Sequence, residues 1–165
     1  MAHFDFEQFA RGYSSFDDQT WHRLRVLYHP DARFRDPVHD IRGHEQIERY
    51  FDDMAQAAQD CAFTLNEPVI RDDTVVVEWQ MIFTSKNLNK GRPITVDGIS
   101  RLRTENGLIV EHRDYYDLGQ MLYENVPLLG RIIRWLKGRL AGSTNGQESD
   151  GIDESVATEG LVRGK

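Results

Sequence analysis

The chain has 165 residues, of which 39% are hydrophobic and 28% charged, with a formal net charge of -7. This length and composition predict one globular domain with a hydrophobic core, and they exclude a chain disordered throughout. No apolar run approaches the roughly 20 residues of a membrane-spanning helix, and the start lacks the basic-then-apolar layout of a signal peptide. The negative charge gives no general attraction to nucleic acid. We therefore expect a cytoplasmic protein that does not bind nucleic acid.

Helical spacing of apolar residues recurs through the first sixty residues. A first helix is indicated by four aromatic residues three or four positions apart, namely Phe6, Phe9, Tyr13 and Phe16. A second helix is expected over "DQTWHRLRVLYHPD", and Pro30 should end it because the residue before a proline is pushed out of the helical region. A short strand, "ARFRD", then leads to a third helix from Gly43 to Asp60.

From Cys61 onward the apolar period changes from helical to two. Four strands are predicted, over residues 61–70, 74–85, 92–104 and 108–118, and the segments between them are rich in turn-forming residues. Consecutive strands joined by short turns form an antiparallel sheet, and the preceding helices must cover one of its faces. The fold class is therefore α+β, with about three helices packed on a curved sheet. Cys61 is the only cysteine, which excludes an internal disulfide and a cysteine-based metal cluster.

The C-terminal part divides into two segments beyond a domain at residues 1–124. Residues 125–140 form a predicted amphipathic helix with leucines and isoleucines on one side and basic residues largely on the other. Three interpretations stay open: the helix lies on an anionic membrane, packs on a partner subunit, or closes over the ligand of its own chain. Residues 141–165 have the composition of a disordered tail.

The order of these elements, with an Asp-Pro after the short strand and "EHRDYYDL" at the end, resembles the nuclear transport factor 2-like superfamily. The resemblance covers Phe4 to Leu122. Within this superfamily the chain more narrowly resembles the SnoaL-like and ketosteroid isomerase-like enzymes. It implies a cone-shaped sheet, plugged by helices at its wide end, with a pocket for a hydrophobic small molecule. It also implies a homodimer and an enzyme without a cofactor.

Specific residues follow from this resemblance. "RDPV" is similar to the isomerase loop that carries the proton-abstracting aspartate, which would make Asp36 the general base. Tyr13 falls near the isomerase tyrosine that donates a hydrogen bond to the dienolate oxygen, and Asp97 is the nearest candidate for the second donor. "VEHRDYYDL" is similar to the last strand of SnoaL-like polyketide cyclases and of limonene epoxide hydrolase, where the aspartate at the position of Asp114 does acid or base chemistry.

The departures from those enzymes are also visible in the sequence. Asp97 aligns with the isomerase aspartate only if a gap is allowed. The epoxide hydrolases need an arginine and an aspartate two positions apart, where this chain has Trp79 and Met81. No complete catalytic set from any one branch is present.

Alternation along the last strand gives an independent argument. In a regular strand Val110, His112, Asp114 and Tyr116 share one face. If that face looks into an apolar pocket, desolvation favours the neutral carboxyl and raises the pKa of Asp114 toward the range that proton transfer needs. With His112 beside it, Asp114 could form half of an acid/base pair.

Plainer interpretations stand beside these. Asp114 could form a salt-bridged strand edge, and Asp36 could be an Asp-Pro turn whose side chain accepts a backbone hydrogen bond. His39 and His44 invite a metal site, but no carboxylate-histidine spacing matches one, so we expect no metal. The predicted catalytic residues are Asp36, Asp114, His112 and Tyr13, and the predicted ligand contacts are Trp21, Tyr28, His39, Phe51, Trp79, Asp97 and Tyr116.

Two functions from different classes follow. The first is a cofactor-independent isomerase, cyclase or lyase that uses aspartate acid/base catalysis on a hydrophobic carbonyl compound. The alternative is a non-catalytic module of the same fold that binds a ligand or partner, with membrane-surface contact through residues 126–140. An enzyme needs Asp36 or Asp114 to face an enclosed pocket.

Overall fold

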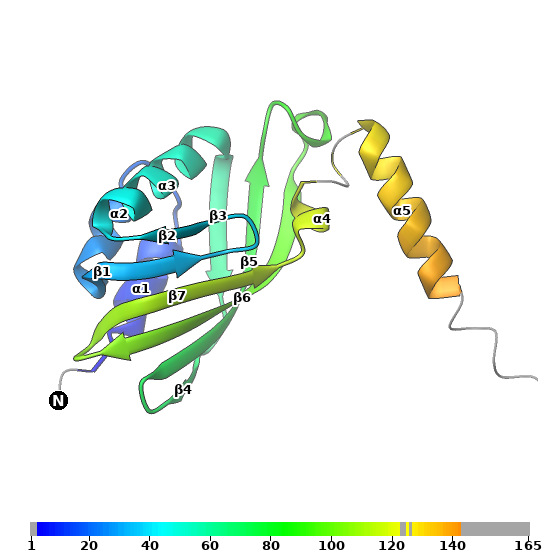
Figure 1. Ribbon diagram of the computed structural model, residues 1–165. Helices are drawn as coiled ribbons and strands as arrows, with labels where there is room; N and C mark the ends of the chain where they lie inside the picture. Colours follow the sequence, from blue (N-terminus) through cyan, green and yellow to red (C-terminus); the bar gives the residue numbers. More distant parts are fainter. Residues whose placement is uncertain (1–2, 123–124, 126, 143–165) are drawn as a thin grey trace, which may run out of the picture.

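The computed structural model describes residues 3–122, 125 and 127–142. A curved sheet is covered on one side by the N-terminal helices, as Figure 1 shows, and the last helix stands away from both. This is the α+β cone predicted from the sequence, and each of the four predicted strand regions contains a strand. The predicted tail from residue 143 onward lies outside the described residues.

Three helices pack on the inner face of the sheet. They are α1 (Phe6–Tyr13), α2 (Thr20–Leu24) and α3 (His44–Ala57). Helix α1 begins where the Asp5 side chain accepts a hydrogen bond from the backbone N–H of Gln8 at 2.8 Å, which satisfies a donor that the first turn leaves free. The buried residues Phe9, Ile47 and Phe51 of α1 and α3 fill the wide end of the sheet.

The second helix is shorter than the sequence predicts. Helix α2 ends at Leu24, a 3₁₀ turn η1 (Arg25–Leu27) follows, and strand β1 (Tyr28–Arg35) begins two residues before Pro30. Pro30 therefore lies inside a strand and does not end a helix. The strand tolerates it because the pairing of β1 with β7 is irregular between Tyr28 and Arg33, where the ladder needs no N–H from the proline.

The sheet has seven strands in the order β2-β1-β7-β6-β5-β3, with β4 paired to β5. Besides β1 they are β2 (Asp40–Arg42), β3 (Gln59–Leu65), β4 (Val69–Arg71), β5 (Thr74–Thr84), β6 (Ile94–Glu105) and β7 (Leu108–Tyr116). A short 3₁₀ turn, η2 (Asn89–Gly91), lies between β5 and β6. Strands β3, β5, β6 and β7 form the predicted antiparallel meander, and β1 joins β7 in parallel, so the sheet is mixed.

Two strand details differ from the predictions. The expected strand over residues 61–70 is divided into β3 and β4 around Pro68, which has no N–H for a ladder. Strand β7 has a bulge at Val110. Arg103 of β6 pairs with Glu111 of β7, but the next residue of β6, Thr104, pairs with Ile109, so Val110 has no partner in this ladder. Ile109 is therefore fully buried in the core and Val110 is only half-buried, against the expectation that Val110 shares a face with His112.

Two helices follow the sheet. Helix α4 (Leu118–Met121) begins at Asp117, whose side chain accepts from the backbone N–H groups of Gly119 and Gln120. Helix α5 (Pro127–Gly142) lies where the amphipathic helix is predicted, and an ion pair of 2.8 Å joins its Lys137 to Asp117. Among the described residues no helix is long and apolar enough to cross a membrane.

Candidate functional site

A cavity of about 490 Å³ lies between the inner face of the sheet and helices α1 and α3. Its walls are mostly aromatic and aliphatic, and three carboxylate residues line it, namely Asp36, Asp53 and Asp114. The lining residues are Phe9, Tyr13, Phe34, Asp36, Val38, His39, Ile41, Gln46, Arg49, Tyr50, Phe51, Asp53, Met54, Phe63, Leu65, Trp79, Met81, Ser100, Asp114, Tyr116 and Met121. Its volume suits a small organic molecule.

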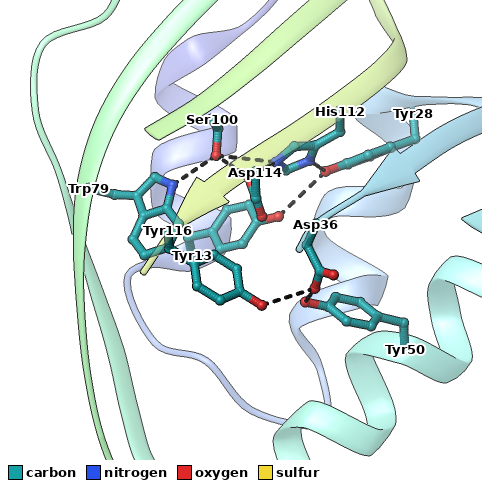
Figure 2. A network of polar contacts seen from close by, with 9 residues as sticks. All are labelled: Tyr13, Tyr28, Asp36, Tyr50, Trp79, Ser100, His112, Asp114 and Tyr116. Atoms are coloured by element: carbon teal, nitrogen blue, oxygen red, sulfur yellow. Dashed lines mark hydrogen bonds and ion pairs between the residues drawn. The ribbon is translucent and has the colours of Figure 1, made fainter. Parts of the chain in front are cut away.

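Asp114, on β7, holds the first polar cluster of the cavity (Figure 2). Its Oδ1 accepts a hydrogen bond from Ser100 Oγ at 2.5 Å and lies 2.8 Å from His112 Nε2. Ser100 Oγ in turn accepts from the indole N–H of Trp79 at 2.9 Å. Among the described residues no hydrogen bond reaches Oδ2, and the side chain is 15% exposed. Asp114 therefore has one oxygen fixed by the protein and one available to a ligand.

The donors in this cluster point toward Asp114. An indole N–H can only donate, so Ser100 must use its own proton for the carboxylate. An ionised Asp114 can only accept, which assigns the His112 proton to Nε2 and leaves Nδ1 as an acceptor for the Tyr28 O–H at 2.6 Å. The cluster fixes the orientation of the Asp114 carboxylate.

Two buried tyrosines extend this chain of donors back to the cavity. Tyr13 Oη lies 3.4 Å from Tyr28 Oη, at the long end for a hydrogen bond. Burial raises the pKa of both phenols well above the ordinary value of about 10, so both keep their protons near neutral pH. Tyr13 lines the cavity, so its O–H could exchange this long bond for one to a ligand oxygen.

Asp36, at the end of β1, holds the second polar cluster. Its Oδ1 accepts from the backbone N–H groups of Val38 and His39 at 2.7 and 2.6 Å, and His39 Nδ1 lies 3.0 Å from both oxygens. Its Oδ2 also accepts from the hydroxyls of Tyr50 at 3.1 Å and Tyr116 at 3.3 Å. Asp36 is thus both the Asp-Pro turn of the plainer interpretation and a cavity residue.

The ionisation of Asp36 follows from these contacts. Burial raises the pKa of its carboxyl, but the hydrogen bonds from the His39 side chain and from the backbone N–H groups of His39 and Val38 outweigh burial. The pKa of Asp36 consequently lies below its ordinary value. A carboxylate that is stabilised in this way is a weak base. Its two oxygens already accept hydrogen bonds from groups of the protein.

Asp36 should make the protein sensitive to acid. Because its pKa is lower in the folded than in the unfolded state, it contributes stability above the unfolded value of about 3.9, and this is lost as the pH falls through the folded value. We expect the free energy of unfolding, measured with urea from pH 6 to pH 3, to fall less steeply for Asp36→Asn than for the wild type. The exposed Asp97→Asn variant is the control. Equal slopes for wild type and Asp36→Asn would contradict this role.

The predicted site residues fall into three groups. Seven line the cavity, namely Tyr13, Asp36, His39, Phe51, Trp79, Asp114 and Tyr116. His112 and Tyr28 are each 2% exposed and lie behind the wall, where His112 is hydrogen-bonded to Asp114 and Tyr28 to His112. Trp21 and Asp97 do not line the cavity.

The positions of Trp21 and Asp97 explain why neither residue lines the cavity. Trp21 is 2% exposed and packs against Tyr28, His44 and Phe51 in the core. Asp97 lies on the outer face of β6, where its Oδ1 accepts a hydrogen bond from Gln80 Nε2 at 2.9 Å. Along this strand the inward positions are the even-numbered Val96 and Ser100, so Asp97 points away from the cavity.

Ser100 and Tyr50 belong to the site but were not among the residues predicted from the sequence. Alternation along β6 from the apolar residues Val96 and Leu102 would have placed Ser100 on the inner face. Tyr50 lies on α3 and lines the cavity, and its hydroxyl donates to Asp36. His39 and His44 are both used in hydrogen bonds, and among the described residues no group of three or more His, Cys, Asp or Glu side chains is arranged to hold a metal.

Solved structures share this fold. A hypothetical protein with a ketosteroid isomerase-like fold from Catenulispora acidiphila DSM 44928, in complex with trimethylamine, is 20% identical with a TM-score of 0.63, covering 73% of this chain and 90% of that one. A candidate SnoaL-like polyketide cyclase from Jannaschia sp. CCS1 is 16% identical with a TM-score of 0.62, over 71% and 85%. TerC, co-crystallised with polyporic acid, is 20% identical with a TM-score of 0.59, over 68% and 90%.

A search of curated proteins finds no match to this sequence. The family model of the SnoaL-like domain matches residues 9–112, which is more than half of the chain. The matched segment runs from Phe9 in α1 to His112 in β7 and includes Asp36, Trp79 and Ser100. The protein belongs to the SnoaL-like domain family, and it shares the fold of solved ketosteroid isomerase-like and NTF2-like proteins.

Proposed function

We propose that the protein is an isomerase or cyclase that acts on a hydrophobic carbonyl compound in the cavity, with Asp114 as general base and no cofactor. The observation that carries this proposal is the asymmetry of the Asp114 carboxylate. Its Oδ1 is held by Ser100 and His112, whereas none of the described residues bonds to its Oδ2, and the side chain lines the cavity. An oriented carboxylate with one open oxygen can take a proton from a bound molecule.

The proposed reaction begins at a carbon next to the ligand carbonyl. Asp114 Oδ2 takes the proton from this carbon, and the electron pair of the broken C–H bond forms the C=C bond of an enolate. The negative charge moves to the carbonyl oxygen, which needs a hydrogen-bond donor. Tyr13 fits this role because it lines the cavity, keeps its proton, and gives up only the 3.4 Å bond to Tyr28.

The second half of the reaction depends on the substrate. In the isomerisation of a β,γ-unsaturated ketone the enolate is conjugated with the second C=C bond, and the protonated Asp114 returns its proton to the far carbon of that bond. In a cyclisation the enolate carbon attacks a second carbonyl of the same molecule, and Asp114 gives its proton to the oxygen of that carbonyl. His112 and Ser100 are positioning residues in both cases, because they hold Oδ1 while Oδ2 reacts.

The walls of the cavity support a hydrophobic and aromatic substrate. The ring centroid of Phe63 lies 5.4 Å from those of Tyr13 and Trp79, and the ring centroids of Trp79 and Tyr116 are 6.1 Å apart. Flat aromatic surfaces therefore surround Asp114. The fold is shared with a candidate polyketide cyclase and with a protein crystallised with polyporic acid, which is consistent with such a ligand.

The proposal is tested by exchange of carbon-bound protons. The protein is incubated in D₂O with a panel of hydrophobic β,γ-unsaturated ketones and aromatic 1,3-diketones, and deuterium entering next to the carbonyl is followed by NMR. We expect at least one compound to exchange faster than in buffer. Binding of the panel without any exchange would favour the alternative, a ligand-binding module without catalysis.

One observation gives that alternative its support. Asp36 accepts hydrogen bonds from two backbone N–H groups and two tyrosine hydroxyls, so this cavity carboxylate is occupied by the protein itself. A site that only binds could leave Asp114 to accept a hydrogen bond from a ligand hydroxyl. The homodimer expected from the resemblance stays a prediction, which light scattering would check.

A further inference from the structure

Helix α5 differs in charge from the rest of the chain. Its sequence, PLLGRIIRWLKGRLAG, contains Arg131, Arg134, Lys137 and Arg139 and no acidic residue. The whole chain has 27 acidic and 20 basic residues, so the part outside α5 is more acidic than the chain as a whole. A partner that is attracted to α5 is therefore expected to be anionic.

The same helix exposes large apolar side chains. Ile132, Trp135, Leu136 and Leu140 are 50%, 57%, 48% and 73% exposed. Their spacing of three, one and four residues places them on one side of an α-helix. Among the described residues none of the core side chains, or of those packed against the core, comes from α5. Figure 1 shows the helix standing apart from the sheet and the other helices.

We propose that α5 is an interfacial helix that binds the surface of an anionic phospholipid membrane. Arg131, Arg134 and Lys137 lie on the side of α5 opposite the exposed apolar residues, and a helix divided in this way lies in the plane of the interface, with its apolar face among the acyl chains. Trp135 is suited to the headgroup boundary, and the Arg139 guanidinium lies 5.0 Å from its ring centroid, where its charge can reach the headgroups.

Charge favours lipid over a second copy of this chain as the occupant. Two copies would bring together two acidic bodies, whereas α5 stands apart from the body and can reach a membrane surface by itself. An anionic surface attracts each Lys or Arg near it. Helix α5 is joined to the body by the Lys137–Asp117 ion pair, in which both side chains are 51% exposed, so the apolar residues can turn to a surface without unfolding the sheet.

Tryptophan fluorescence of the full chain gives a selective test. Of the three tryptophans, Trp21 and Trp79 are 2% and 7% exposed, and only Trp135 is exposed to solvent. We expect phosphatidylglycerol-containing vesicles to shift the emission to shorter wavelength and to sediment the protein, and high salt to weaken both effects. Pure phosphatidylcholine vesicles should give at most a small effect. The absence of a shift and of sedimentation with phosphatidylglycerol would overturn the proposal.

Substitutions then separate lipid from a second copy. Leu136→Glu and Arg131→Glu should each weaken binding to the phosphatidylglycerol vesicles about tenfold or more, since each removes a favourable contact and adds a repelled charge. The control is Val69→Glu, at a position that is 69% exposed on β4, which should bind as the wild type does. If Leu136→Glu instead converts a dimer to a monomer in light scattering while vesicle binding stays unchanged, α5 covers a second copy and the proposal is wrong.

Discussion

The Asp114→Asn variant should lose at least about 100-fold in the rate of deuterium exchange, because proton transfer by a positioned side chain contributes about 10²–10⁴-fold. Asparagine has nearly the same shape and can still accept the hydrogen bond from Ser100. Its amide cannot take the proton, however, so the loss measures base catalysis and not packing. The measurement is the NMR exchange rate with the most active ketone of the panel.

Two matched variants make this result specific. Asp97→Asn changes a carboxylate on the outer face of the sheet and should leave the rate unchanged. Asp36→Asn changes a second carboxylate of the cavity, and we expect a smaller loss of rate than for Asp114→Asn, together with lower stability, because Asp36 fixes the loop before β2. If Asp36→Asn abolishes exchange while Asp114→Asn retains it, the base is Asp36.

Gly98→Ala should destabilise the protein by about 2–4 kcal/mol through overpacking and the loss of a buried hydrogen bond. Gly98 pairs with Trp79 across strands β6 and β5, and a Cβ at Gly98 would lie 2.3 Å from Cη2 and Cζ2 of the indole. The ring must move to make room, which breaks its hydrogen bond to Ser100 and pushes apolar surface into the cavity.

The free energy of unfolding by urea measures this effect, and Gly138→Ala is the control. A Cβ at Gly138, on α5, meets no atom within 4 Å, so the same substitution there should be neutral or stabilising. Gly98→Ala should also weaken ligand binding in the cavity. If Gly98→Ala and Gly138→Ala are equally stable, the packing of the Trp79 indole on Gly98 does not contribute to stability and the prediction is wrong.

Most of the fold could be predicted because its apolar periods are local. The period of two in β5 and β6 matches the observed alternation of buried and exposed residues. The early end of α2 and the parallel pairing of β1 with β7 could not be predicted, because they depend on contacts between distant segments. The bulge at Val110 is a further example, since it moves Ile109 into the core without any turn residue to mark it.

The site could be predicted only in part for the same reason. Asp36 and Asp114 could be proposed from their local motifs, and both line the cavity. The bond from Tyr28 to His112 joins residues 84 positions apart, and that from Tyr116 to Asp36 joins residues 80 apart, so neither is visible in local spacing. The error at Asp97 came from alignment to another enzyme, whereas alternation along β6 would have pointed to Ser100.

Asp36 and Asp114 differ because of their surroundings. Asp36 is 1% exposed and both of its oxygens accept hydrogen bonds, which favours a permanent anion that holds the loop. Asp114 is 15% exposed and only its Oδ1 accepts bonds from the described residues. A pair of titratable groups in unlike environments can divide structural and chemical roles between them. The central claim is therefore that the chemistry belongs to Asp114.

A crystal structure with an unreactive analogue of the most active ketone tests this claim most directly. We predict that the carbon next to the carbonyl lies about 3–3.5 Å from Asp114 Oδ2, the distance of a near-attack geometry. The carbonyl oxygen should accept a hydrogen bond from Tyr13. An analogue whose reactive carbon lies against Asp36, with Asp114 out of contact, would contradict the assignment of Asp114 as the base.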